Sequence, residues 1–265
     1  ATRLAPAGQA PVWTYALRAE ADWQARDVLP NDVGGTDFVA LFHGTVFGRF
    51  RLRVPGRHMV QNALGAIAAA HAIGIPPGPI REALASFQGV RRRFEAKGQV
   101  RGVSVYDDYA HHPTEIVATL AAARERHPGR LICVFQPHTY HRTRTLFDEF
   151  ARAFILADWV IVTDVYVPSG REQPVPDVRS ADLVRAMVHP RAEYVGALDA
   201  IVERLLTEAR PGDLVLTMGA GDVFRVAEAL VRQLREGQES SVHGALPTPP
   251  PQSVEREQSA GPCGP

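Results

Sequence analysis

Residues 131–135, Leu-Ile-Cys-Val-Phe, form a short uninterrupted apolar run that is followed directly by polar residues. Comparable apolar runs occur at 103–106, 159–162 and 213–218, with a weaker one at 193–195. Between them lie segments with helical character, near residues 114–127, 144–156, 180–188, 197–209 and 222–236. Apolar strands that alternate with helices are typical of a parallel sheet covered on both faces. Residues 98–236 are therefore predicted to form an α/β domain with a Rossmann-like, doubly wound, mainly parallel sheet.

The residues before this domain follow a different pattern. Residues 36–42 and 46–54 are predicted to be antiparallel strands joined around His43-Gly44. Two helices are expected next, from about 58 to 73 and from about 79 to 89; Gly74 stops the first, and the second ends at Gly89. A polar stretch at 91–98 then predicts a junction, so residues 1–97 are assigned to a first domain part. From Gly237 onward Ser, Pro, Gln and Gly dominate, which predicts a disordered tail over 237–265.

The composition is that of a globular protein. Of its 265 residues 45% are hydrophobic and 22% are charged, and 29 basic groups balance 29 acidic ones. This balance gives no electrostatic reason to expect nucleic acid or an anionic membrane as a partner. No apolar run is long enough to span a bilayer, the first residues lack the apolar core of an export signal, and two cysteines make no disulfide framework. We therefore expect a cytoplasmic protein.

Chemically versatile side chains follow the predicted strands. The segment 107–115 follows the first strand, 136–144 the second, 164–172 the third and 219–222 the last. Ligands of open parallel sheets bind at the carboxyl ends of the strands, and the first two segments are expected on adjacent strands. Arg142 can bind a carboxylate or phosphate, and His111 and His138 can donate hydrogen bonds or transfer protons near neutral pH. Asp108 can accept hydrogen bonds from a sugar or bind a metal, so we predict a functional site at this edge.

Other interpretations of these segments are purely structural. Pro113 and Glu115 fit the first turn of a helix, and Gly219-Ala220-Gly221 fits a tight turn whose helix could also hold a phosphate. Arg91 and Arg92 are expected in an exposed linker.

The sequence also leaves two other functions open. One is a non-catalytic nucleotide or UDP-sugar binding module, and the other is a metal-dependent phosphohydrolase with five ligands: Asp107, Asp108, His111, His112 and His138.

An ordered series of motifs over roughly residues 12–236 resembles the Mur ligase family. The two most specific motifs are Asp-Asp-Tyr-Ala-His-His-Pro-Thr-Glu at 107–115 and Phe-Gln-Pro-His-Thr-Tyr-His-Arg-Thr at 135–143. The shorter matching segments are 54–58, 62–63, 87–95 and 218–222. The two long motifs are similar to those of the family members that add L-alanine to UDP-N-acetylmuramate in peptidoglycan synthesis.

This resemblance implies an ATP-dependent ligation in which a carboxylate is first phosphorylated and the acyl phosphate is then attacked by an amine. It implies that Asn62 contacts adenine, that Arg93 contacts the phosphates and that Asp108 contacts the nucleotide ribose. Arg93 and His111 are the catalytic residues it implies. The residues implied at the amino-acid and muramoyl end are Tyr109, His111, His138 and Arg142.

The resemblance also shows differences. Met59 stands where many relatives have Asn, and Thr139 stands where some have Arg. Family members bind ATP and Mg²⁺ with an upstream Gly-Thr-x-Gly-Lys-Thr loop, but no Gly-Lys-Thr or Gly-Lys-Ser occurs here and Lys97 is the only lysine. The first domain part is therefore expected to correspond to the trailing part of the central ATPase domain, with the main Mg²⁺ ligands farther upstream in relatives. The chain alone is expected to be inactive.

Overall fold

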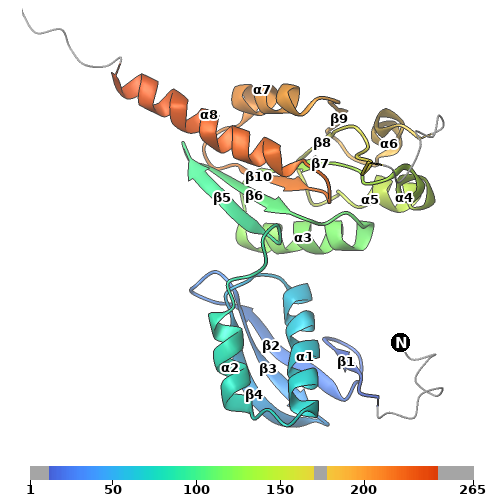
Figure 1. Ribbon diagram of the computed structural model, residues 1–265, viewed down its shortest axis with the longest axis vertical. Helices are drawn as coiled ribbons and strands as arrows, with labels where there is room; N and C mark the ends of the chain where they lie inside the picture. Colours follow the sequence, from blue (N-terminus) through green and yellow to red (C-terminus); the bar gives the residue numbers. More distant parts are fainter. Residues whose placement is uncertain (1–11, 170–177, 244–265) are drawn as a thin grey trace, which may run out of the picture.

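The computed structural model describes residues 12–169 and 178–243, which form two sheets (Figure 1). The first sheet has the order β1-β2-β3-β4. Its strands are β1 (Tyr15–Ala16), β2 (Trp23–Pro30), β3 (Thr36–Phe42) and β4 (Thr45–Leu52). The predicted hairpin is confirmed, because β3 and β4 pair antiparallel and the turn residues His43 and Gly44 both have positive φ. Such a turn has the twist that a two-residue hairpin needs.

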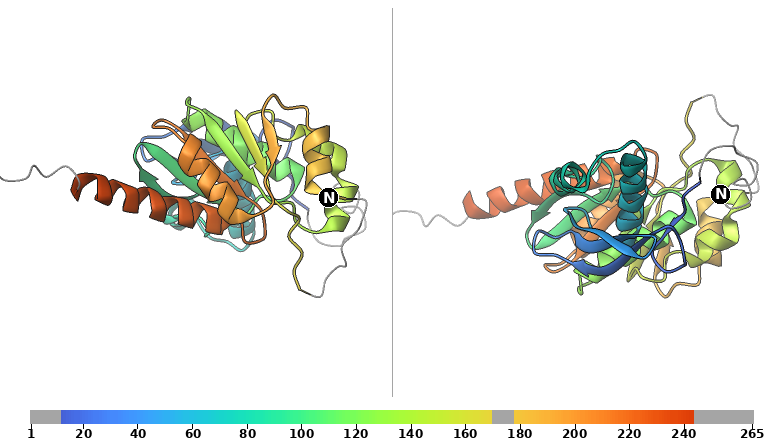
Figure 2. Two further views of the ribbon diagram at one scale, coloured as in Figure 1. Left: turned by 90° about the horizontal axis from the view of Figure 1, so that it is seen from above. Right: turned by 90° about the horizontal axis from the view of Figure 1, so that it is seen from below.

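Helices α1 (Arg57–Ala72) and α2 (Pro77–Ser86) cover one side of this sheet (Figure 2). Leu64 and Ile67 of α1 are fully buried against the sheet residues Trp23 and Phe38. The predicted end of the first helix is confirmed, because Gly74 has a φ of 82° and its N–H donates to the carbonyl of His71. The second helix begins and ends slightly earlier than predicted.

The second sheet has the strand order β5-β6-β10-β7-β8-β9. Its strands are β5 (Glu95–Val100), β6 (Val103–Asp108), β7 (Leu131–Phe135), β8 (Trp159–Val162), β9 (Ala192–Tyr194) and β10 (Leu214–Met218). All neighbouring pairs are parallel except β5 with β6. The predicted α/β class with a mainly parallel, doubly wound sheet is confirmed.

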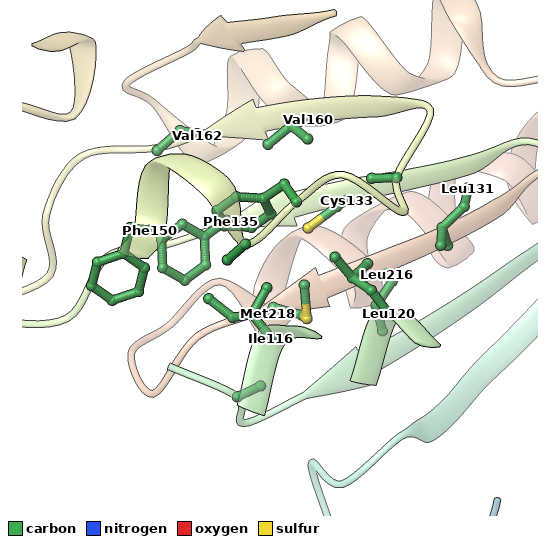
Figure 3. Close-up of a cluster of buried hydrophobic side chains, with 14 of the residues drawn as sticks. Ile116, Leu120, Leu131, Cys133, Phe135, Phe150, Val160, Val162, Leu216 and Met218 are labelled. Atoms are coloured by element: carbon green, nitrogen blue, oxygen red, sulfur yellow. The ribbon is translucent and has the colours of Figure 1, made fainter. Parts of the chain in front are cut away.

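Helices cover both faces of the second sheet, with α3 on one side and α7 and α8 on the other (Figure 1). The helices are α3 (Pro113–Arg126), α4 (Tyr140–Thr145), α5 (Phe147–Arg152), α6 (Ser180–Ala186), α7 (Leu198–Glu208) and α8 (Phe224–His243). Successive residues of a strand point to opposite faces of this sheet. Cys133 and Phe135 pack with α3 and α5 (Figure 3), whereas Ile132 and Val134 pack with α7 and α8. Burial on both faces explains the uninterrupted apolar runs.

The edge strand β5 was not expected from the sequence. Only Val100 of this strand is buried, because β5 lies at the edge of the sheet and much of it is solvated. Its polar composition therefore resembles that of a linker. The boundary predicted between residues 97 and 98 falls inside β5, and the change from one sheet to the other comes before Glu95.

Two further expectations are corrected. The prediction of a disordered tail from Gly237 is wrong for residues 237–243, because α8 continues to His243; the other residues of the predicted tail, 244–265, lie outside the described part. Gly237 is tolerated in this amphipathic helix, where its carbonyl accepts from Arg101 Nη2 at 2.6 Å. The strands before the two long motifs are also not adjacent, because β10 lies between β6 and β7. Within residues 12–169 and 178–243, no helix combines the length and apolar character needed to cross a membrane.

Candidate functional site

A cavity of ≈ 410 Å³ lies where the two domain parts meet. Both parts and the linker between them supply its walls, which include Pro55, His58, Met59, Asn62, Val90, Arg93, Phe94, Asp108, Thr114 and Glu115. The three residues expected to bind the nucleotide, Asn62, Arg93 and Asp108, thus share one cavity. Met59 lines it next to Asn62, whose Nδ2 lies 3.9 Å from the Met59 sulfur. We call this space the interdomain cavity.

Asp108 ends strand β6 and joins the linker to the sheet. Its side chain is almost fully buried, Oδ2 accepts from the N–H of Phe94 and Oδ1 from the N–H of Ala110, both at 2.7 Å. Burial raises the pKa of Asp108 to about 6, although these hydrogen bonds and the Arg93 charge oppose the rise. Each carboxylate oxygen keeps a second acceptor position, so Asp108 can still accept from a ligand hydroxyl.

Ionisation of Asp108 is expected to lower the stability of the chain as the pH rises. The pKa is near 6 in the folded chain against an ordinary 3.8, so folding favours the protonated form. That contribution, about 1–3 kcal/mol, is fully present below pH ~4 and is lost as the pH rises through ~6. Urea unfolding between pH 4 and 7 should show the wild type losing stability relative to Asp108→Asn, which cannot ionise. If the free energy of unfolding of the wild type stays constant or rises relative to that of Asp108→Asn as the pH increases, this expectation is wrong.

Glu115 links the interdomain cavity to the neighbouring histidine. As predicted it serves the first turn of α3, where Oε2 accepts from the N–H groups of His111 and His112 at 3.0 and 3.2 Å. Its Oε1 also lies 3.7 Å from Arg93 Nη1, and Oε2 lies 3.5 Å from His111 Nδ1. Partial burial opposes ionisation, but the His111 N–H and the charges of His111 and Arg93 outweigh it and lower the pKa of Glu115. The sequence indicated only the structural role of this carboxylate.

His58 contributes an imidazole to the wall of the cavity. Burial lowers the pKa of His58, and the nearby Arg93 charge lowers it further against the opposing effect of Glu115. The ring is therefore neutral at pH 7 and can stack on a planar ligand or accept a hydrogen bond.

The other four expected site residues, Tyr109, His111, His138 and Arg142, form a second group, which we call the substrate-end group. The ring centroids of Tyr109 and His111 are 5.2 Å apart, and those of His111 and His138 are 5.8 Å apart. Arg142 Nη1 lies 3.5 Å from His138 Nδ1. None of the four lines the interdomain cavity, but the Arg93 guanidinium lies 5.4 Å from the Tyr109 ring centroid. The group therefore continues from the cavity along the carboxyl edge of the sheet.

The loop after β7 is held in an unusual conformation. Thr139 has a φ of 67° and a ψ of 139°, a region that β-branched residues rarely occupy. Its N–H donates to the Tyr166 carbonyl at 2.9 Å, its Oγ1 accepts from Arg142 N–H at 3.4 Å, and its carbonyl accepts from Thr143 Oγ1 at 2.8 Å. Strain of this kind costs about 1–3 kcal/mol and persists where surrounding bonds impose it. These bonds turn His138 and Arg142 toward each other.

Tyr166 supports the same loop and was not singled out from the sequence. Its ring stacks on His138 with centroids 5.7 Å apart, and its N–H donates to the Pro137 carbonyl at 2.8 Å. The only signal in the sequence was its place in the polar segment after the third predicted strand. Contact with His138 depends on the neighbouring positions of β7 and β8 in the sheet.

Arg92 is not the exposed linker residue that the sequence suggested. Its Nε lies 2.9 Å from Asp107 Oδ2, and its Nη2 and Nη1 donate to the carbonyls of Gly219 and Gly221 at 2.7 and 2.9 Å. Only 21% of the side chain is exposed, and Asp107 is fully buried. The physical reason is the position of β10 beside β6, which brings the loop after β10 next to Asp107.

The predicted tight turn at Gly219-Ala220-Gly221 is confirmed by its packing. Gly219 has a φ of 153°, and a Cβ on Gly221 would come within 2.3 Å of Gln136 Oε1 and 2.4 Å of Tyr166 Cγ. Gln136 ties this turn to the loop after β7, because its Nε2 donates to Asp222 Oδ1 at 2.8 Å. The glycines therefore allow two loops to approach closely.

The five residues of the metal-dependent alternative do not converge. Asp107 contacts Arg92 and Thr217 Oγ1, both Asp108 oxygens accept backbone N–H groups, and the His112 side chain caps α3. Across residues 12–169 and 178–243, no three His, Cys, Asp or Glu side chains are placed to hold one ion. The five residues thus form no shared ligand cluster of the kind that the metal-dependent phosphohydrolase would need.

Residues 92–221 match the family described as Mur ligase, glutamate ligase domain. The motif resemblance is thereby confirmed, and these residues form a Mur ligase domain.

Among individual relatives, the chain is similar to UDP-N-acetylmuramate–L-alanine ligases. It is 47% identical to that of Solibacter usitatus over 225 residues, which are 84% of this chain and 47% of that protein. It is 42% identical to that of Caldanaerobacter subterraneus over 223 residues, 83% of this chain and 48% of that protein. The solved UDP-N-acetylmuramate–alanine ligase of Thermotoga maritima superimposes with a TM-score of 0.69 at 26% identity, over 85% of this chain and 48% of that one. The chain spans about half the length of these relatives.

Proposed function

We propose that this chain supplies the nucleotide and amino-acid ends of an ATP-dependent ligase that joins L-alanine to UDP-N-acetylmuramate in peptidoglycan synthesis. The convergence of Asn62, Arg93 and Asp108 in the interdomain cavity is the main support. The names of the relatives support the choice of substrates. We place the reaction in the cytoplasm, with ATP, UDP-N-acetylmuramate and L-alanine as the small-molecule partners.

In the proposed reaction the muramoyl carboxylate attacks the γ-phosphorus of ATP, and ADP leaves. The amine of L-alanine then attacks the acyl phosphate, phosphate leaves, and the nitrogen loses a proton. Catalysis of such steps consists mainly of positioning and charge stabilisation. Mg²⁺ would supply further charge stabilisation; the described residues contain no cluster of three or more His, Cys, Asp or Glu side chains placed to hold it.

The nucleotide end follows from the chemistry of the cavity wall. The Asn62 amide can both donate to and accept from the edge of an adenine ring, and Asp108 can accept from a ribose hydroxyl. Arg93 is partly exposed and its ion pair with Glu115 is long, at 3.7 Å, so its guanidinium can bind phosphate. Neutral His58 adds a flat surface beside the base.

The substrate end follows from the substrate-end group. His111 Nδ1 lies 2.8 Å from the Tyr109 carbonyl, so the neutral ring carries its proton on Nδ1 and leaves Nε2 free to accept one. We assign His111 the acceptance of the proton that the attacking amine loses. Arg142 is assigned to a substrate carboxylate, with His138 beside it at 3.5 Å.

The nucleotide assignment is tested by titrating the purified chain with ADP in a calorimeter. Arg93→Ala is expected to weaken ADP binding by about 10- to 150-fold, the equivalent of one lost charged hydrogen bond of about 1.5–3 kcal/mol. Arg91→Ala is the matched control, because Arg91 is exposed on the same linker and does not line the cavity. Equal ADP affinity in wild type and Arg93→Ala would refute the assignment of Arg93.

A further inference from the structure

We infer that Arg92 is a positioning residue whose single guanidinium holds together the linker that presents Arg93 and the loop that carries Tyr109. The inference rests on the proposed function, since it assigns Arg92 an effect on nucleotide binding. Arg92 does not line the interdomain cavity, so any effect must pass through the residues it holds.

The Arg92 side chain joins elements that are far apart in the sequence. It contacts the end of β6 through Asp107 and the turn after β10 through the carbonyls of Gly219 and Gly221, all within 2.9 Å. The guanidinium also lies 4.8 Å from the ring centroid of Phe224, at the start of α8. Three contacts from one planar group need the fixed geometry of arginine, which the single ammonium of lysine cannot reproduce.

The Arg92 backbone is held equally well. Its carbonyl accepts from the N–H of Tyr109 at 2.6 Å, and its N–H donates to Glu95 Oε2 at 2.8 Å. Arg92 and Phe94 have φ values of 58° and 48°, so two left-handed residues flank Arg93. The Phe94 N–H donates in turn to Asp108. This backbone path sends the Arg92 side chain into the sheet edge and the Arg93 side chain into the cavity.

Tyr109 is the point at which the two assigned ends meet. Its ring centroid lies 5.2 Å from the Arg92 guanidinium and 5.4 Å from that of Arg93. The position of this first member of the substrate-end group is thus tied to the same linker as the phosphate-binding arginine. Loosening the Arg92 contacts should therefore displace Arg93 and Tyr109 without removing either side chain.

The test compares Arg92→Lys with Arg91→Lys in the full 265-residue chain, by ADP titration and amide hydrogen exchange. Arg92→Lys keeps a positive charge beside Asp107. Both measurements are made at a temperature well below the unfolding transition of this variant. We expect about tenfold weaker ADP binding, with faster exchange at the N–H groups of Phe94, Tyr109 and Gly219 but unchanged exchange within β7 and β8. Arg91→Lys should change neither quantity.

The outcomes separate this inference from the proposed function. If the wild type binds ADP and Arg92→Lys binds it equally well, the inference is overturned. Faster exchange spread evenly over the second sheet with unchanged affinity would show a purely structural role. If the wild type fails to bind millimolar ADP, the proposed nucleotide site fails. In that case amide hydrogen exchange at Tyr109 and Gly219 tests the positioning role of Arg92 by itself. Exchange rates in Arg92→Lys equal to those of the wild type would refute that role.

Discussion

The 265-residue chain alone is expected to form no ligation product when incubated with ATP, Mg²⁺, UDP-N-acetylmuramate and L-alanine. Phosphoryl transfer needs a backbone cradle for the β- and γ-phosphates, a lysine beside it and a held Mg²⁺. The sequence contains no Gly-Lys-Thr or Gly-Lys-Ser, and its single lysine, Lys97, pairs with Glu95 and Glu228. Arg93 can contact phosphate but can replace neither the cradle nor the metal.

Phosphate release and product formation are measured together, first for this chain and then for a fusion to the upstream half of a full-length relative. Turnover of about 1 s⁻¹ or faster is ordinary for enzymes and is expected only from the fusion. Such turnover by the chain alone would contradict the assignment of the missing phosphate contacts to an upstream region. It would shift the catalytic centre to the Asp and His residues at the sheet edge.

Arg92→Ala is expected to lower the free energy of unfolding by about 3–5 kcal/mol. Removing one partner of a buried ion pair leaves the other charge without compensation. Asp107 is fully buried, and its remaining side-chain contact is the Thr217 hydroxyl, whose Oγ1 lies 2.7 Å from Oδ1. Two backbone carbonyls, of Gly219 and Gly221, lose their donors as well. Urea unfolding followed by circular dichroism measures the change.

A double-mutant cycle with Asp107→Asn identifies the cause. Because the double variant leaves no unpaired charge at positions 92 and 107, its loss should be smaller than the sum of the two single losses by about 0.5–3 kcal/mol. Arg91→Ala should stay within about 0.5 kcal/mol of the wild type, as expected for an exposed side chain. If the two single losses add strictly, or if Arg92→Ala loses as little stability as Arg91→Ala, the Arg92–Asp107 pair contributes little to the free energy of unfolding.

The second sheet could be predicted because its strands are buried on both faces. Runs such as 131–135 and 159–162 are wholly apolar, and the structure buries every residue in them. Strand β5 could not be predicted in this way, because an edge strand needs few buried side chains and β5 has no apolar run. Strand order was also beyond the sequence, since nothing in residues 214–218 indicates that β10 separates β6 from β7.

The candidate site shows the same division. The motif residues Asn62, Arg93 and Asp108 were selected from the sequence, and the structure brings them together in one cavity. Arg92 was misjudged because it differs from Arg93 only in the direction of its side chain. That direction depends on positive φ values at Arg92 and Phe94. For residues other than glycine, a positive φ cannot be predicted from the residue type. Its partners Gly219 and Gly221 lie more than a hundred residues away in the chain.

The most direct test of the central claim, that the interdomain cavity is the nucleotide site, is photolabelling of the chain with 8-azido-ADP followed by peptide mapping. We expect label on the cavity-lining segments 54–62 or 89–94, with protection by excess ADP. Label confined to peptides that do not line the cavity, such as 24–42 or 198–208, would contradict it.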